Sequence, residues 1–237
     1  MIVNNAILYL LRAGCSWRQL PADFPPYQSV YRHFAAWRAD GTVDRLHDLL
    51  RERLRAAEGR AEPPTAGVVD AQSVKGAATV GRDTRGYDAG KRTNGRKRHI
   101  VVDTLGLLLV VMVTAASVQD RDGGRDVLAR LRAALPGVSL VWADGGYAGK
   151  LVEWAKLALS LLVDIVRKRD GQRGFEVLPR RWVVERTFSW ITSCRRLACD
   201  YERTIEHSEA MVKWAMIALM VRRLARVETG TPPAYNW

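Results

Sequence analysis

Hydrophobic residues in the first sixty positions recur every three or four residues, a spacing typical of amphipathic helices. Three such segments, at residues 3–14, 27–41 and 42–59, each end at a glycine, a residue that commonly stops a helix. Residues 60–67 then break the periodicity with two adjacent prolines and are expected to form a linker. The pattern therefore predicts a small, all-helical region over residues 1–60.

After the linker, hydrophobic residues gather in short β-branched runs that predict strands. Strands are expected at residues 66–71, 97–104, 107–116, 138–144 and 161–168. Helices are expected between and after them, at residues 120–135, 149–159, 180–202 and 208–226. An antiparallel start followed by alternating helices and strands is the order of an RNase H-like fold. We therefore predict an α/β domain over residues 66–226, a mixed sheet flanked by helices.

The charge of the chain indicates a polyanionic partner. The 237 residues include 37 Lys and Arg against 25 Asp and Glu, a net charge of +12 at pH 7. Such a surplus is typical of proteins that bind nucleic acid, and an anionic membrane surface is the second choice. The three cysteines show no C-x-x-C pair, which disfavours a disulfide framework and a zinc knuckle. With no signal-peptide pattern and no sufficiently long apolar run, we expect a cytoplasmic, nucleoid-associated protein.

Three carboxylates stand where one site could be built. Asp70 ends the first expected strand, Asp144 ends the fourth, and Glu185 lies in the helix after the last. The first and fourth strands would be neighbours, so the two aspartates could project from adjoining strand ends. Crowded carboxylates are costly without a cation, and phosphodiester transfer by two metal ions needs oxygen ligands. We predict that these three residues are catalytic and bind Mg²⁺ or Mn²⁺, with two ions expected.

Taken singly, each of these acids has a simpler explanation. Asp144 followed by Gly145 could form a turn, Asp70 could merely end a strand, and Glu185 could pair with Arg181 in solvent. Asp103 precedes the stretch Thr104-Leu105-Gly106 and is expected in a hairpin turn. The conjunction of the three acids carries the hypothesis.

Basic residues gather where DNA could pass. Residues 89–99 hold most of them, and we interpret this segment as a phosphate-gripping hairpin, the alternative being a solvated basic face. On the late helix, Glu185 heads a polar stripe with Arg181 one turn before it and Arg196 three turns after it. The predicted DNA-binding residues are Lys75, Lys91, Arg92, Arg96, Lys97, Arg98, His99, Arg181, Arg195 and Arg196. The helix within residues 26–38 could read a DNA groove, although a supporting role in a helix bundle is favoured.

Several segments, taken in order, resemble a known family. These are "VVDAQSVKG", "GYDAGKRTNGRKRHIVVDTLGLLLVVMVTAASVQDRDG", "WADGGYAG" and "RRWVVERTFSWITSCRRLACDYE". Together they resemble the DDE transposases of bacterial insertion sequences in the IS-five family, from about residue 68 to residue 201. The segment "LRAGCSWRQLPADFPPYQSVYRHFAAWRADGT" is similar to the helical region that precedes the catalytic domain in that family.

The resemblance implies an RNase H-like catalytic domain, Mg²⁺-dependent cleavage at transposon ends, and strand transfer into target DNA. Asp70, Asp144 and Glu185 fall on the family's acidic triad, and Arg181 falls on the arginine of its R-x-x-x-E element. The expected partners are double-stranded DNA, both the terminal inverted repeats and the target, and a second copy of the chain in a homodimeric synaptic complex.

Some positions depart from the family pattern. Leu178 replaces a common tyrosine, and Thr192 replaces a basic residue, for which Arg195 and Arg196 are candidate substitutes. Relatives usually begin with a further helical stretch, so we expect a truncated chain, or one joined to an upstream frame, and weakened recognition of transposon ends. Two alternatives stay open: a catalytically inactive or truncated relic that only binds DNA, and an RNase H-like nuclease without joining activity.

Overall fold

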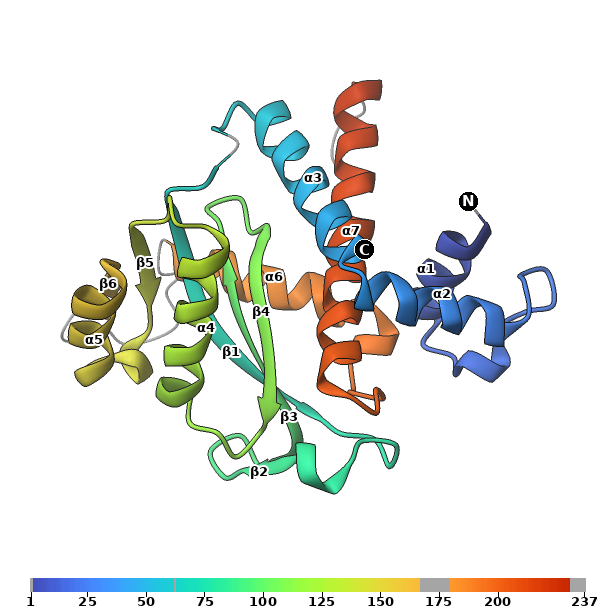
Figure 1. Cartoon of the computed structure of the whole chain (residues 1–237), viewed down its shortest axis with the longest axis horizontal. Coiled ribbons are helices and arrows are strands. Elements are labelled where there is room, and N and C mark those ends of the chain that lie inside the picture. Colours follow the sequence, from blue (N-terminus) through green and yellow to red (C-terminus); the bar gives the residue numbers. More distant parts are fainter. Residues whose placement is uncertain (1, 62, 167–179, 231–237) are drawn as a thin grey trace, which may run out of the picture. The chain divides into compact units, whose positions relative to one another are not determined.

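A computed structural model of the chain describes residues 2–61, 63–166 and 180–230 (Figure 1). The chain forms two compact units. The sheet unit comprises residues 63–74 and 84–189, and the helical unit comprises residues 1–62, 75–83 and 190–237. The division expected from the sequence, residues 1–60 and 66–226, concerns function and not compactness, and it stays a prediction.

The described part of the sheet unit is built on one six-stranded sheet. Its strands are β1 (Ala66–Lys75), β2 (Gly86–Asp88), β3 (Thr93–Val102), β4 (Leu108–Ala115), β5 (Leu140–Ala143) and β6 (Leu162–Ile165). The order is β2-β3-β1-β5-β6, and β4 pairs with β3. β3 runs antiparallel to β2 and β4, whereas β5 runs parallel to β1 and β6. The predicted RNase H-like mixed sheet is confirmed, and only the three-residue β2 was missed.

Helices α4 (Asp120–Ala134) and α5 (Lys150–Leu159) close the core of the sheet unit. Buried aliphatic residues of the sheet, among them Val69, Val101 and Val141, pack with residues of these helices in one cluster. Two glycines let α4 approach closely. A Cβ atom on Gly123 would lie 2.1 Å from the ring of His99, and one on Gly124 would lie 2.7 Å from the ring of Tyr147.

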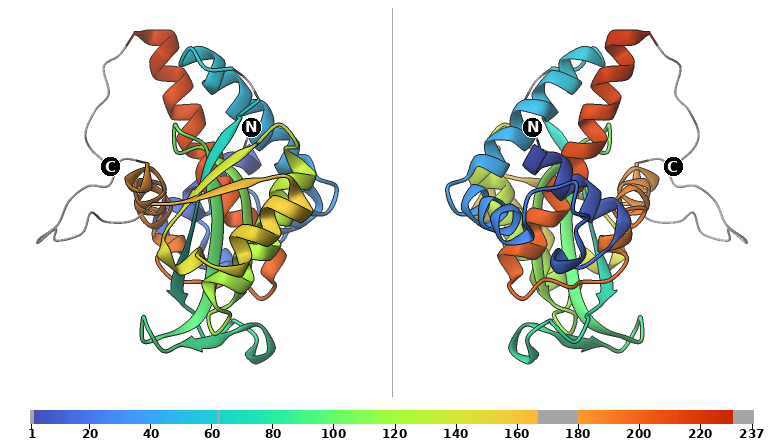
Figure 2. Two further views of the ribbon diagram at one scale, coloured as in Figure 1. Left: turned by 90° about the vertical axis from the view of Figure 1, so that its left-hand side faces the viewer. Right: turned by 90° about the vertical axis from the view of Figure 1, so that its right-hand side faces the viewer.

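Four helices form most of the helical unit: α1 (Ile2–Ala13), α2 (Tyr27–Ala39), α3 (Thr42–Ala57) and α7 (Ile205–Thr229). The expected helices at these places are confirmed. α3 and α7 lie side by side (Figure 2). Ion pairs between Asp44 and Lys213, and between Glu58 and Arg223 at 2.9 Å, link the two helices along their length.

The helix expected at residues 180–202 is shorter in the structure, and that prediction was wrong in its extent. α6 spans Arg181–Thr192, and a short 3₁₀ turn at Arg195–Leu197 follows it. Beyond the end of the helix, Arg196 turns inward, where it pairs with Glu202 at 2.7 Å and donates to the carbonyl of Cys15 at 3.0 Å. The polar stripe drawn from Glu185 to Arg196 therefore does not exist. Leu178 lies outside the described residues.

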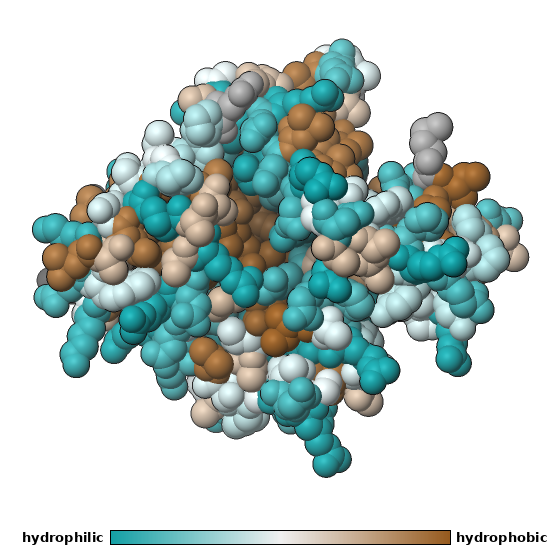
Figure 3. Space-filling model, in the orientation of Figure 1, coloured by the Kyte–Doolittle hydropathy of each residue, from teal (hydrophilic) through white to brown (hydrophobic). Residues whose placement is uncertain are grey.

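The face shown in Figure 3 is mostly hydrophilic, with hydrophobic residues in scattered patches. Within residues 2–61, 63–166 and 180–230, no helix combines the length and apolar character needed to cross a bilayer.

Candidate active site

The sheet brings Asp70 and Asp144 together. β1 and β5 pair in parallel, with Ala66 opposite Leu140 and Val68 opposite Trp142. Continuing that register sets Asp70 opposite Asp144, which directly follows β5. Asp144 begins a short 3₁₀ turn and fixes it, because its Oδ1 accepts a hydrogen bond from the amide of Gly146 at 2.8 Å. The predicted neighbouring strands are therefore present, and Asp144 follows the end of β5 as expected, but the prediction that Asp70 ends its strand was wrong, because β1 continues to Lys75.

Asp70 is a half-buried carboxylate with a second acid beside it. Burial raises the pKa of this carboxyl to about 6. A hydrogen bond from the amide of Ala71 to Oδ1, at 2.7 Å, opposes the increase, and the negative charge of Asp144 adds to it. The more distant charges of Arg181 and Lys91 lower the pKa again by smaller amounts. A cation placed between Asp70 and Asp144 would relieve this cost.

Helix α6 carries Glu185 to the neighbourhood of Asp144. The helix is fastened to the turn between β3 and β4, where the hydroxyl of Thr187 donates to the carbonyl of Gly106 at 2.8 Å. The guanidinium of Arg186 donates to the carbonyl of Leu105 at 3.1 Å. The turn itself is held by Asp103, as predicted, because its carboxylate accepts the amides of Leu105 and Leu107 at 2.9 and 2.8 Å.

Arg181 joins two of the three predicted acids. Its Nη2 atom is 3.6 Å from Oε1 of Glu185, one helical turn away, and 3.7 Å from Oδ2 of Asp144. One guanidinium therefore contacts the carboxylates of both residues, while its charge also acts on Asp70. Two of the three acids predicted from the sequence therefore contact one cationic side chain, and the third lies within reach of its charge.

The donors at this place suit a hard divalent cation. They are carboxylate oxygens, which Mg²⁺ and Mn²⁺ prefer as protein ligands, and one of them belongs to the half-buried Asp70, whose pKa is raised. Among the described residues, however, no three His, Cys, Asp or Glu side chains are already gathered as a metal-binding group. Glu185 is exposed and lies against Arg181, so it would have to change partner to complete a metal site.

The predicted DNA-binding residues divide into two groups by burial. Lys75, Lys91, Arg92 and Arg195 are exposed, and Arg181 is half-buried. The other five are buried: Arg96, Lys97, Arg98, His99 and Arg196. DNA contact is not proposed for this second group, because their side chains lie in the protein interior.

The buried basic residues have internal partners far away in the sequence. Arg96 donates to the hydroxyl of Thr84 at 2.8 Å, and Lys97 lies 2.8 Å from the carboxylate of Asp120. The Nε2 atom of His99 is 3.0 Å from the hydroxyl of Thr114, and burial lowers the pKa of His99 to about 4. β3 lies between β4 and β1, so its residues 95–102 are buried.

Comparison with known proteins identifies the family of the chain. Residues 61–220 match the protein family described as Transposase DDE domain, and residues 2–47 match the one described as Putative transposase of IS4/5 family. The chain belongs to the DDE transposase family, as the resemblance predicted.

Two curated relatives come from an insertion element of Burkholderia cepacia. The putative transposase for insertion sequence element IS402 is 30% identical over 145 residues, which cover 56% of this chain and 66% of that protein. An uncharacterized 16.2 kDa protein of the same element is 44% identical over 56 residues, 23% of this chain and 38% of that protein. The matched segments thus span less than two thirds of either relative.

Among solved structures, the Mos1 strand transfer complex aligns with 98% of this chain and 79% of that chain. The TM-score is 0.33 and the sequence identity is 13%, a likeness too distant to carry an argument.

Proposed function

We propose that this chain is an insertion-sequence transposase that cleaves DNA at transposon ends and joins those ends to target DNA. The observation that carries the proposal is the contact of Arg181 with both Asp144 and Glu185, beside Asp70 on the paired parallel strand. Membership of the DDE transposase family supports it. The chemistry would act on a phosphodiester, with water and then a DNA 3′-hydroxyl as nucleophiles.

Two divalent cations, Mg²⁺ or Mn²⁺, would be held by Asp70, Asp144 and Glu185. When bound, such ions supply Lewis-acid activation of the attacking oxygen and neutralise charge on the phosphate. Arg181 would keep Glu185 beside Asp144 before the metal enters, since both carboxylates contact the same guanidinium. Gly145 would leave room for DNA, because a side chain at that position would project into open space.

Double-stranded DNA is the proposed substrate, both as terminal inverted repeats and as target. In the sheet unit, the exposed Lys91 and Arg92 and the half-buried Arg181 are available for phosphates. In the helical unit, Lys75 and Arg195 are exposed and are proposed to contact the DNA backbone as well. We further propose that two copies of the chain bridge the two transposon ends.

A cleavage assay with DNA carrying the element's ends, in the presence of Mg²⁺, tests this proposal. Joined products support transposition, nicks without joining indicate a nuclease, and retention of DNA without cutting indicates a relic that only binds. Asp144→Asn should abolish cleavage while DNA binding persists. Substantial cleavage by that variant would remove Asp144 from the mechanism.

A further inference from the structure

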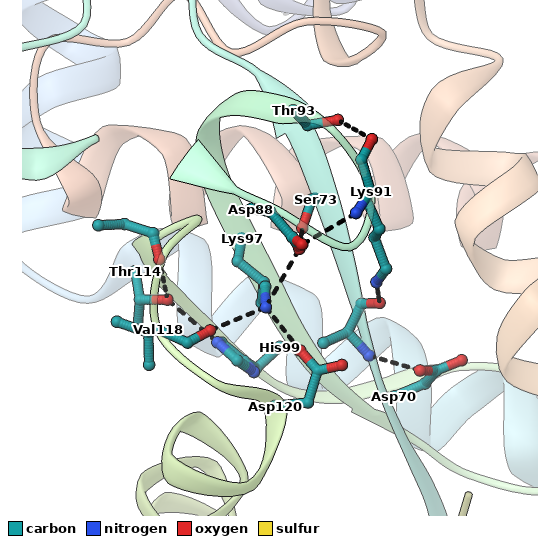
Figure 4. A network of polar contacts seen from close by, with 12 residues as sticks. Asp70, Ser73, Asp88, Lys91, Thr93, Lys97, His99, Thr114, Val118 and Asp120 are labelled. Carbon is teal, nitrogen blue, oxygen red and sulfur yellow. Dashed lines mark hydrogen bonds and ion pairs between the residues drawn. The ribbon is translucent and has the colours of Figure 1, made fainter. Parts of the chain in front are cut away.

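A short hairpin lies beside Asp70 and Asp144, which are called the acid pair below. The hairpin is organised by the carboxylate of Asp88 at the end of β2. One oxygen of Asp88 accepts the backbone amide of Lys91 at 3.0 Å, which closes the turn. The other accepts the hydroxyl of Ser73 in β1 at 2.6 Å and lies 3.3 Å from Nζ of Lys97 in β3 (Figure 4). Asp88 therefore fixes the turn to both of the strands beneath it.

Lys97 anchors this arrangement in the interior. Its side chain is only 6% exposed, and its ammonium contacts the carboxylates of Asp88 and Asp120 and donates to the carbonyl of Val118 at 2.8 Å. A buried ammonium is stable only when it is paired in this way. The hydrogen bond from Ser73, ahead of the other contacts, lowers the pKa of Asp88 to about 2, so Asp88 is ionised at neutral pH.

The anchored turn delivers Lys91 to the acid pair. Nζ of Lys91 donates to the carbonyl of Ala71 at 3.0 Å, next to Asp70, and its charge acts on the Asp70 carboxylate. The adjoining Arg92 has a φ of 50°, a backbone conformation that arginine rarely adopts. External bonds such as those of Asp88 therefore have to stabilise the turn, because its own residues do not favour it.

A polar hollow of about 790 Å³ opens between this turn and the acid pair's own loop. Its walls come from residues 87–91 of the hairpin, from Lys97, from residues 116–122, and from Gly146, which follows Asp144 by two positions. The volume lies within the range of roughly 300–1,000 Å³ found for small-ligand sites, so one nucleotide fits. A nucleotide in the hollow would have its phosphate within reach of the exposed ammonium of Lys91.

We propose that Asp88 is a positioning residue, which holds the turn so that Lys91 binds the phosphate of a DNA nucleotide in the hollow beside Asp70 and Asp144. This inference rests on the proposed function. A lysine acts as a compact positive charge toward phosphate. Beside two carboxylates, such a charge is needed because the carboxylates themselves repel the DNA strand.

The test measures binding of end-containing DNA by the full chain, by fluorescence anisotropy without divalent metal. The direction in which the affinity changes distinguishes the two explanations. Asp88→Ala removes a negative charge, which by electrostatics alone should strengthen DNA binding. If Asp88 acts through Lys91, Asp88→Ala should instead weaken binding by roughly tenfold, the size of one charged hydrogen bond. The matched control is Asp83→Ala, which removes the same charge from an exposed position and should bind as tightly as the wild type or slightly more tightly.

A double-mutant cycle separates positioning from general damage. Lys91→Met should weaken binding to a similar degree and lower the salt dependence of binding by about one phosphate contact. The double variant should bind no more weakly than the weaker single variant. Independent, multiplying losses, or an Asp88→Ala variant that binds as well as Asp83→Ala, would overturn the inference.

Further measurements distinguish local loosening of the turn from general unfolding and from failure of the proposed function. Amide hydrogen exchange of residues 86–95 should increase in Asp88→Ala while exchange in α4 and β5 stays near that of the wild type. If Asp88→Ala does not fold, Asp88→Asn replaces it with the same expected signs. A wild-type chain that neither binds nor cleaves end DNA would instead contradict the proposed function, so the two failures are distinguishable.

Discussion

Asp70, within β1, lies opposite Asp144, which directly follows the parallel strand β5, and the charge of Asp144 is one reason why the pKa of Asp70 is raised to about 6. Burial is the larger reason. The fold thus keeps a carboxylate where its ionised form is costly, a pattern common in functional sites. The first prediction measures that cost directly.

Asp70→Asn should stabilise the metal-free protein at neutral pH. The pKa of Asp70 is about 6 in the folded chain, against an ordinary value of 3.8. The folded state therefore binds more protons between these values, and the stability that Asp70 contributes is full below pH 3.8 and lost as pH rises through 6. Above pH 7, the variant should gain up to about 3 kcal/mol in free energy of unfolding, measured by urea denaturation in EDTA.

At pH 4 the same variant should match the wild type closely. His99, whose pKa is lowered to about 4 by burial, gives the opposite pH dependence, so the contribution of Asp70 must be taken from the difference between variant and wild type. A variant that is less stable than the wild type at pH 7.5 would show that Asp70 is not electrostatically strained.

Glu185→Gln should separate activity from stability. Glu185 is exposed, and its contact with Arg181 at 3.6 Å is a surface ion pair, worth about 0–1 kcal/mol. We expect the melting temperature to change little while Mg²⁺-dependent cleavage falls at least roughly a hundredfold, as for loss of one essential group. The control is Glu153→Gln, an exposed glutamate in the first turn of α5, which should leave cleavage unchanged.

Gly123→Ala should destabilise the sheet unit. The added methyl carbon would lie 2.1 Å from the ring of His99, which is fully buried and has little room to move. The overlap should cost about 2–3 kcal/mol, even after the gain in helix propensity that alanine brings. Gly137→Ala is the matched control, since its nearest neighbour would be 4.0 Å away, and thermal unfolding of the two variants gives the comparison.

Arg196→Met should unfold the helical unit more readily without acting on DNA directly. Arg196 and Glu202 form a pair in which the side chains are 6% and 7% exposed, and removing one partner leaves a buried charge. A loss of about 3–5 kcal/mol is expected in denaturant titrations. Adding Glu202→Leu to this variant should recover much of the loss. If folded Arg196→Met bound DNA more weakly than the wild type, a direct DNA contact by Arg196 would have to be reconsidered.

The sequence predicted the framework of the site well because its signals are local. Short, β-branched apolar runs located β1 and β5, and Asp70 and Asp144 directly follow the apolar residues of these runs. Turn chemistry identified Asp103, whose carboxylate does hold the β3–β4 turn. Such features depend on neighbours within a few positions, which a single sequence displays.

The sequence misled us about the basic run from Arg96 to His99. A cluster of cations suggests an exposed face, yet these residues lie in β3, which is covered by neighbouring strands and by α4. Their partners, including Thr84, Thr114 and Asp120, come from other segments, so no local pattern announces them. Asp88 was missed for the same reason. The role of a charge is set by what the fold places opposite it.

The pairing of α3 with α7 has a consequence for folding of the chain during its synthesis. α3 emerges early from the ribosome, whereas α7 is made after the entire sheet, at a rate of roughly 5–20 residues per second. Until then, the inward side of α3, with Val43 and Leu54, lacks its final cover. The helical unit therefore cannot assemble until α7 has been synthesised. During that time, chaperones can bind the exposed apolar stripe of α3.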